Sequence, residues 1–137
     1  MNYQINILQG LGEVKFGMAP EETTEFLGKT DEMEEIDNGF GDSITVLHFH
    51  EHGVTLFFDS LSRKLSCIAV ENEAATLFGE KIFHKSEQEI VRLLVDNGFY
   101  EQDIETEAWG ERRVSFGDGN IDLFFSENKL QSVTFGD

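Results

Sequence analysis

Residues 11–59 read LGEVKFGMAPEETTEFLGKTDEMEEIDNGFGDSITVLHFHEHGVTLFFD, and they realign without a gap on residues 78–126, FGEKIFHKSEQEIVRLLVDNGFYEQDIETEAWGERRVSFGDGNIDLFFS, at a constant offset of 67. Ten of the 49 aligned pairs are identical, including Gly12 with Gly79 and Glu22 with Glu89. The triplet LFF at 56–58 returns at 123–125. Self-similarity that keeps both a helix start and a strand triplet in register indicates an internal duplication.

Helix signals stand at the same place in each copy. In the first copy, Pro20 followed by two glutamates predicts a helix start, because proline has no N–H to lose in the first turn and carboxylates suit the positive helix end. Gly28 predicts the end of that helix. In the second copy, Ser86 and Glu89 have the spacing of a capping box. Both helices are short and amphipathic, so each is expected to pack on a sheet.

An acidic segment and then a hairpin follow each helix. The acidic segments, 31–37 and 100–105, are expected to be solvated edge strands, because charge on an edge blocks unwanted pairing. Asp118-Gly119 predicts a two-residue turn, and the aligned turn in the first copy is Glu51-His52. These turns predict hairpin strands at 45–50, 54–59, 112–117 and 121–126. Because paired residues share a face, the predicted core pairs are Phe49 with Val54, Leu47 with Leu56, Thr45 with Phe58, Phe116 with Ile121, and Val114 with Leu123.

These elements predict an α+β fold. Two tandem helix-plus-antiparallel-sheet repeats, at about 11–70 and 78–135, are expected to form one two-layer domain over residues 1–137. Joined at their edges, the repeats give a continuous antiparallel sheet of about six to eight strands with the helices on one face. The other face of the sheet is left open.

The charge of the chain restricts the choice of partner. Ten basic residues against 27 acidic ones give a net charge of −17, a field that repels nucleic acids and anionic membranes. A basic protein partner or a cation is therefore favoured, and an acidic surface that only keeps the protein soluble is the alternative. The lone Cys67 forms no intrachain disulfide, and its apolar setting predicts a buried small hydrophobe rather than a reactive thiol.

The sequence predicts a cytoplasmic location. Residues 1–5 lack a basic region and a long apolar run, so no signal peptide is expected. Nowhere do about 18 apolar residues occur together, so no membrane-spanning helix is expected. The oligomeric state is left open.

Little in the sequence indicates catalysis or a cofactor. His48, His50 and His52 alternate as metal ligands on a strand do, but the predicted register places His52 in a turn, and no metal site is expected. The segment from Asp118 to Asp122 resembles the start of a calcium loop and is better explained as a hairpin turn. No nucleotide-binding glycine loop or nucleophile motif is present, so a non-enzymatic role without cofactors is expected.

The face opposite the core is the candidate binding surface. The hairpin register places His48, Arg113, Phe57 and Phe124 on this face, the two phenylalanines at equivalent positions of the two copies. Arg113 is expected to lie across Phe124 as a cation–π partner. Carboxylates such as Asp59 and Asp122 are expected around this set. Phe57 and Phe124 are either covered by neighbouring chain segments or exposed as anchors for a partner.

The opening of the first copy, from Leu11 to Asp31, resembles the repeats of the superfamily that contains the β-lactamase inhibitor protein and the small outer-membrane lipoprotein of the barrel-assembly machine. The segments Gly17-Met18 and Leu27-Gly28-Lys29 carry the resemblance, with Thr30 where proline is commoner. The resemblance implies a saddle-shaped open sheet that grips a protein partner. In size, charge and build the chain is also similar to bacterial immunity proteins, which are small acidic inhibitors of secreted toxins.

The leading hypothesis is therefore a non-enzymatic protein-binding module, most concretely an immunity-type inhibitor of a basic toxin domain. The alternatives are a domain that binds a small molecule or a cation on the open sheet face, and an enzyme of unrecognised type. A neighbouring gene for a basic, toxin-like domain would favour the first.

Overall fold

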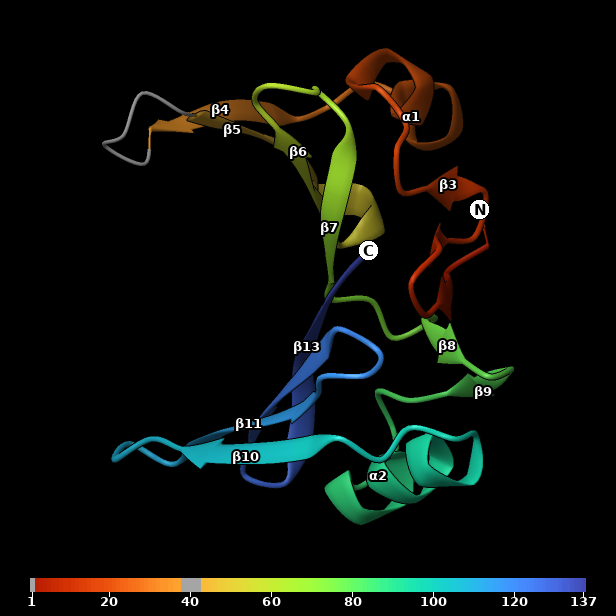
Figure 1. Ribbon diagram of the computed structural model, residues 1–137, viewed down its shortest axis with the longest axis vertical. Helices are drawn as coiled ribbons and strands as arrows, with labels where there is room; N and C mark the ends of the chain where they lie inside the picture. Colours follow the sequence, from red (N-terminus) through yellow and green to blue (C-terminus); the bar gives the residue numbers. More distant parts are fainter. Residues whose placement is uncertain (1, 38–42) are drawn as a thin grey trace.

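A computed structural model describes residues 2–37 and 43–137 of a chain that is mostly β, with 47% strand and 16% helix (Figure 1). An eight-stranded antiparallel sheet has the order β10-β11-β12-β13-β7-β6-β5-β4. Its strands are β4 (Glu32–Asp37), β5 (Ser43–Phe49), β6 (Val54–Asp59), β7 (Leu65–Val70), β10 (Gln102–Thr106), β11 (Glu111–Phe116), β12 (Ile121–Ser126) and β13 (Lys129–Gly136).

The hairpin registers predicted from the sequence are confirmed. In the first half Phe49 pairs with Val54 and Leu47 with Leu56, and in the second half Phe116 pairs with Ile121. Each half also has one register shift in its last strand pair, between Phe57 and Phe58 in β6 and at the corresponding place in β12. The two halves therefore share the strand pairing and the irregularity that interrupts it.

Strands β7 and β13 join the two halves. Ala69 pairs with Thr134, and these two residues are equivalent in the repeats because the last strands align at an offset of 65. On either side of this pair, Val70 pairs with Val133 and Ile68 with Phe135. A pair of equivalent residues at the centre of an antiparallel ladder defines an approximate twofold axis through the sheet. Features of one half therefore recur on the opposite side of this axis.

The predicted fold class is wrong, because a second sheet shares the layer with the helices. Its five short strands have the order β3-β2-β1-β8-β9. They are β1 (Gln4–Asn6), β2 (Gly10–Leu11), β3 (Val14–Lys15), β8 (Thr76–Leu77) and β9 (Glu80–Lys81). The helices lie at opposite ends of this small sheet, so the chain is not a two-layer α+β repeat with only helices on one face (Figure 1). Strands of two or three residues show no hydrophobic periodicity in a sequence.

Strand β1 ties the two repeats together in this second sheet. Ile5 pairs with Leu11 of the first repeat in an antiparallel ladder and with Leu77 of the second in a parallel one. All three side chains are buried, so the short strands belong to the core. Strand β1 lies before the first repeat, which is predicted to begin at about residue 11.

The helices begin and end where the sequence predicts. Helix α1 (Pro20–Leu27) ends at Gly28, which has a φ of 83°. Helix α2 (Glu87–Asp96) begins with a capping box, in which the backbone N–H of Glu89 donates to Oγ of Ser86 and the backbone N–H of Ser86 donates to the Glu89 carboxylate. These bonds satisfy backbone donors that the first helical turn leaves free.

The turns between β5 and β6 and between β11 and β12 differ from the predicted two-residue form. A 3₁₀ turn, η1 (His50–His52), is followed by Gly53 at a φ of 61°. A Cβ at Gly53 would lie 2.2 Å from the carbonyl oxygen of Glu71, so both the left-handed backbone and the close approach require glycine. In the second half, Asn120 at a φ of 46° takes the corresponding place. Each connection contains four residues because the flanking pairs are Phe49 with Val54 and Phe116 with Ile121.

The core lies between the large sheet and the layer of short strands and helices. The core face of the large sheet is confirmed, since its predicted apolar residues are at most 3% exposed. They pack with Ile90 and Leu94 of α2 and Leu27 of α1. In the described part of the chain, the helices are too short or too polar to cross a membrane.

Leu56→Ala is expected to lower the free energy of unfolding by about 2–5 kcal/mol, because the change leaves a cavity in the core. Leu61→Ala is the matched control, since Leu56 is fully buried and Leu61 is 84% exposed. Urea denaturation of both variants measures the difference. Equal losses of stability would contradict the assignment of the core face.

Candidate functional site

The face of the large sheet opposite the core is here called the open face. One row of paired residues crosses it from edge to edge through all eight strands. In strand order the row is Asp103, Ser115, Asp122, Thr134, Ala69, Thr55, His48 and Glu32. Small side chains occupy its centre and carboxylates its two ends. The open face is thus polar in the middle, and its apolar groups lie to either side of this row.

Phe57 and Phe124 are partly exposed and occupy equivalent positions on the open face. In the sheet, β7 and β13 separate the strands that carry them, and the two side chains lie on opposite sides of the central row. Strand spacing and residue rise place them about 20 Å apart along the sheet. They are therefore two separate apolar points and not one central cluster.

The surroundings of the two phenylalanines differ. Phe57 pairs with Val46, which is 2% exposed although it lies outside the main core. Ile36 and Ile44 form the next pair toward the end of this arm and are 48% and 40% exposed. Ile36, Ile44, Val46 and Phe57 thus form an apolar strip across β4, β5 and β6. Neither isoleucine was predicted from the sequence. Ile36 lies in the acidic segment, which does not reveal which of its residues share a face, and Ile44 precedes the predicted strand 45–50.

Arg113 occupies the position in the second half that Val46 occupies in the first. It pairs with Phe124 in the ladder, and its guanidinium lies 2.6 Å from a carboxylate oxygen of Glu105. Its Nε is buried without a hydrogen-bond partner. Among the described residues, the aromatic contacts do not include Arg113, so the expected cation–π contact with Phe124 is replaced by an ion pair.

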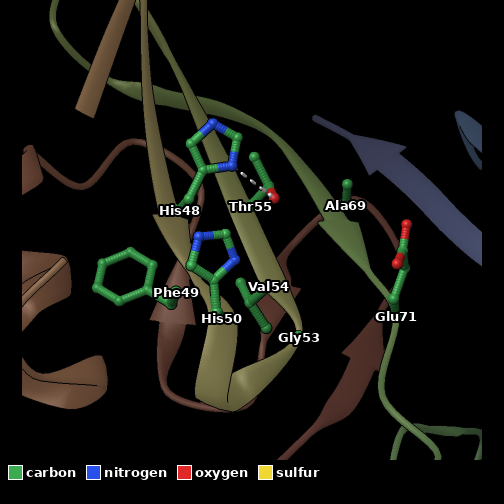
Figure 2. Close-up of a pocket in the computed structure, with 8 residues that line it drawn as sticks. All are labelled: His48, Phe49, His50, Gly53, Val54, Thr55, Ala69 and Glu71. Atoms are coloured by element: carbon green, nitrogen blue, oxygen red, sulfur yellow. Dashed lines mark hydrogen bonds between the residues drawn. The ribbon is translucent and has the colours of Figure 1, made fainter. Parts of the chain in front are cut away.

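His48 lies at the edge of a shallow depression of about 300 Å³ (Figure 2). Its Nε2 is 2.8 Å from Oε1 of Glu34, and its Nδ1 is 3.5 Å from Oγ1 of Thr55. The ring of His50 is stacked on that of His48, with centroids 5.9 Å apart and planes inclined by 14°. Figure 2 shows both rings on one side of the strand, with Phe49 directed away from them. These two histidines are therefore brought together.

His52 is separated from this group, as its predicted place in the turn implies. Its Nδ1 lies 2.6 Å from the hydroxyl of Tyr3, and its Nε2 lies 3.0 Å from the carbonyl oxygen of Leu27. With Leu27 O as the acceptor, Nε2 carries the proton and Nδ1 accepts from Tyr3. His52 therefore links the turn to the N-terminal segment and to the end of α1.

The two carboxylates predicted for the site have structural contacts. Asp59 accepts hydrogen bonds from the backbone N–H groups of Leu61 and Ser62, so it caps the turn after β6. Asp122 accepts a 2.6 Å hydrogen bond from the hydroxyl of Ser115 on the central row. The six predicted site residues are thus divided between the two halves of the sheet. Arg113, Phe124 and Asp122 lie on β11 and β12, and His48, Phe57 and Asp59 lie on β5 and β6.

The calcium-like sequence from Asp118 to Asp122 forms a turn, as predicted. The carboxylate of Asp118 accepts hydrogen bonds from the backbone N–H groups of Tyr100 and Glu101. This carboxylate therefore fixes the segment that leads into β10.

Comparisons with known proteins give a likeness of fold. No family model and no curated protein match the chain. Among solved structures, an extracellular protein containing an SCP domain from Bacillus anthracis aligns with a TM-score of 0.55 at 15% sequence identity. The alignment covers 97% of this chain and 50% of that one, so the chain spans about half the length of the similar protein. At this identity the likeness concerns the fold alone.

Cys67, which pairs with Phe57, is expected to react slowly with iodoacetamide at neutral pH. Burial raises the pKa of the Cys67 thiol, the backbone N–H of Ile68 partly opposes this rise, and the carboxylates of Asp122 and Asp137 add smaller increases. A raised pKa leaves less of the reactive thiolate. Mass spectrometry should show severalfold slower alkylation in the folded chain than in urea. Equal rates at pH 7 would contradict this expectation.

Proposed function

We propose that the chain is a non-enzymatic protein-binding module that holds a basic partner against the open face. The observation that carries the proposal is the pair of partly exposed phenylalanines, Phe57 and Phe124, at equivalent positions on the face opposite the core. An aromatic side chain off the core face contributes less to folding than a buried one. Phenylalanine is also among the residues that are enriched at the centres of protein interfaces.

The charge of the open face supports a basic partner. The strand pairing places five carboxylates on this face, those of Glu32, Glu34, Asp103, Glu105 and Asp122. The whole chain carries a net charge of −17. Complementary charge accelerates association, whereas buried apolar anchors slow dissociation.

The shape of the sheet also suits a partner of protein size. The arms formed by β4 with β5 and by β10 with β11 project to the same side of the molecule, and the large sheet curves between them (Figure 1). The apolar pair Ile36 and Ile44 lies on one arm, and Trp109, which is 74% exposed, lies at the turn of the other. Anchors distributed over both arms and the sheet favour one large partner surface over a small ligand.

An immunity-type inhibitor of a basic toxin domain is the most concrete form of this proposal. The repeat that resembles the β-lactamase inhibitor superfamily supports an inhibitory grip by an open sheet. The predicted cytoplasmic location agrees with an inhibitor that protects the cell producing the toxin. A small-molecule or cation-binding domain is the second candidate, favoured by the depression beside His48 and His50.

Phe57→Ala and Phe124→Ala are each expected to weaken partner binding by about 2 kcal/mol or more, about 30-fold in Kd, as the loss of an aromatic anchor does. Each should lower the free energy of unfolding by less than half the loss caused by Leu56→Ala, because both side chains are already partly exposed. The partner is first captured with the wild-type chain and identified by mass spectrometry. Titration calorimetry at low and high salt then compares the variants.

Leu61→Ala is the control for this titration, because Leu61 is exposed in the turn after β6. Its affinity should equal that of the wild type, and all affinities should fall as salt increases. The proposal is wrong if the wild-type chain captures no protein, or if the Phe57→Ala, Phe124→Ala double variant retains every protein that the wild type captures. It is also wrong if the phenylalanine variants unfold as readily as Leu56→Ala.

A further inference from the structure

Two carboxylates and an imidazole converge at the edge of the open face. Glu32 and Glu34 of β4 and His48 of β5 each offer a ligand atom, and these atoms all lie within 4.8 Å of one another. Glu32 is the ladder partner of His48, and Glu34 Oε1 is 2.8 Å from His48 Nε2. Alternate residues of a strand face the same side, so the backbone itself holds the three groups together.

We propose that Glu32, Glu34 and His48 bind a divalent transition-metal ion of the zinc type. One imidazole nitrogen with carboxylate oxygens is a donor set that zinc accepts, whereas calcium and magnesium prefer oxygen ligands alone. The ion takes the place of the proton that His48 Nε2 shares with Glu34. The site shares Glu32, Glu34 and His48 with the open face but includes neither Phe57 nor Phe124, so zinc binding to the chain alone tests it separately from partner binding.

The surroundings of His48 suit a metal ligand. Its Nδ1 faces the hydroxyl of Thr55, and a hydrogen bond from Nδ1–H leaves the Nε2 lone pair directed at the two carboxylates. A second imidazole lies beside the cluster, because the ring of His50 is stacked on that of His48 with centroids 5.9 Å apart. The depression beside His48, lined also by Glu71 and Ala69, lies on the Thr55 side of the imidazole ring (Figure 2).

The second half of the chain forms the same strand pairing without an imidazole at the position of His48, so the fold itself does not require this cluster. Asp103 pairs with Ser115 and Glu105 with Arg113, where the first half has Glu32 with His48 and Glu34 with Val46. A guanidinium therefore neutralises the carboxylate in the second half, at a distance of 2.6 Å. In the first half Val46 supplies no charge, and an imidazole stands where the second half has a serine. A cation between Glu32 and Glu34 would provide the neutralisation that Arg113 provides on the other side of the twofold axis.

Zinc titration of the full chain tests the site. The protein is purified without an affinity tag, freed of metal with a chelator, and titrated with Zn²⁺ in a calorimeter, and cobalt absorption reports the ligand field. We expect one ion per chain in the wild type. His48→Gln and Glu34→Gln should each raise Kd at least about tenfold, since mutating even the outer-shell partners of metal ligands lowers affinity about 10- to 100-fold.

The matched controls are His84→Gln and Glu25→Gln, because both residues are exposed and lie outside the cluster. Both should retain the wild-type affinity, and urea denaturation should show that all four variants fold. Binding of the same strength to all five chains would be adsorption to surface carboxylates and would overturn the proposal. Absence of one-to-one binding to the wild type would also overturn it.

Discussion

The antiparallel pairing of β7 with β13 is the constraint on which the rest of the structure depends. It joins two four-stranded units into one sheet, with the equivalent residues Ala69 and Thr134 facing each other at the centre. The chain packs closely at the end of this ladder, where a Cβ at Gly136 would lie 2.7 Å from Asn120 Nδ2 and 3.0 Å from the carbonyl oxygen of Ser66. Because the join is antiparallel, the strands equivalent to one another run in opposite directions across the open face. Phe57 and Phe124 consequently lie on opposite sides of the central row and not side by side.

The same symmetry shows which residues the scaffold requires and which it does not. The core triplets and the strand irregularities recur in both halves, because each half must cover the same kind of interior. On the open face, phenylalanine recurs, while Val46 and His48 of one half stand opposite Arg113 and Ser115 of the other. The two halves of the open face therefore differ in chemistry on one backbone. A protein partner without internal symmetry would need such a difference.

Local signals in the sequence were sufficient for the helices, the hairpin registers and the core. A capping box such as Ser86 with Glu89 involves groups only three residues apart, and alternating apolar residues on either side of a turn determine which face is buried. The fold class could not be obtained in this way. Strands β2 and β8 contain two residues each, and β1 joins partners that are far apart in the chain. The pairing of Glu32 with His48 was equally hidden, because the acidic segment has no apolar alternation from which to derive a register.

The carboxylates of the edge strands have two explanations, protection of the sheet edge and binding of a metal ion. The residues beside these carboxylates distinguish the two. All residues of β4 and β10 are exposed, and charge on such strands prevents the sheet from pairing with another chain. That role needs negative charge at the edges, and both halves provide it. It does not require an imidazole beside the carboxylates, nor a second imidazole stacked on the first. His48 and His50 are therefore the residues that edge protection leaves unexplained. The ladder places His48 beside Glu32 and Glu34, with ligand atoms of all three within 4.8 Å of one another, and the ring of His50 is stacked on that of His48.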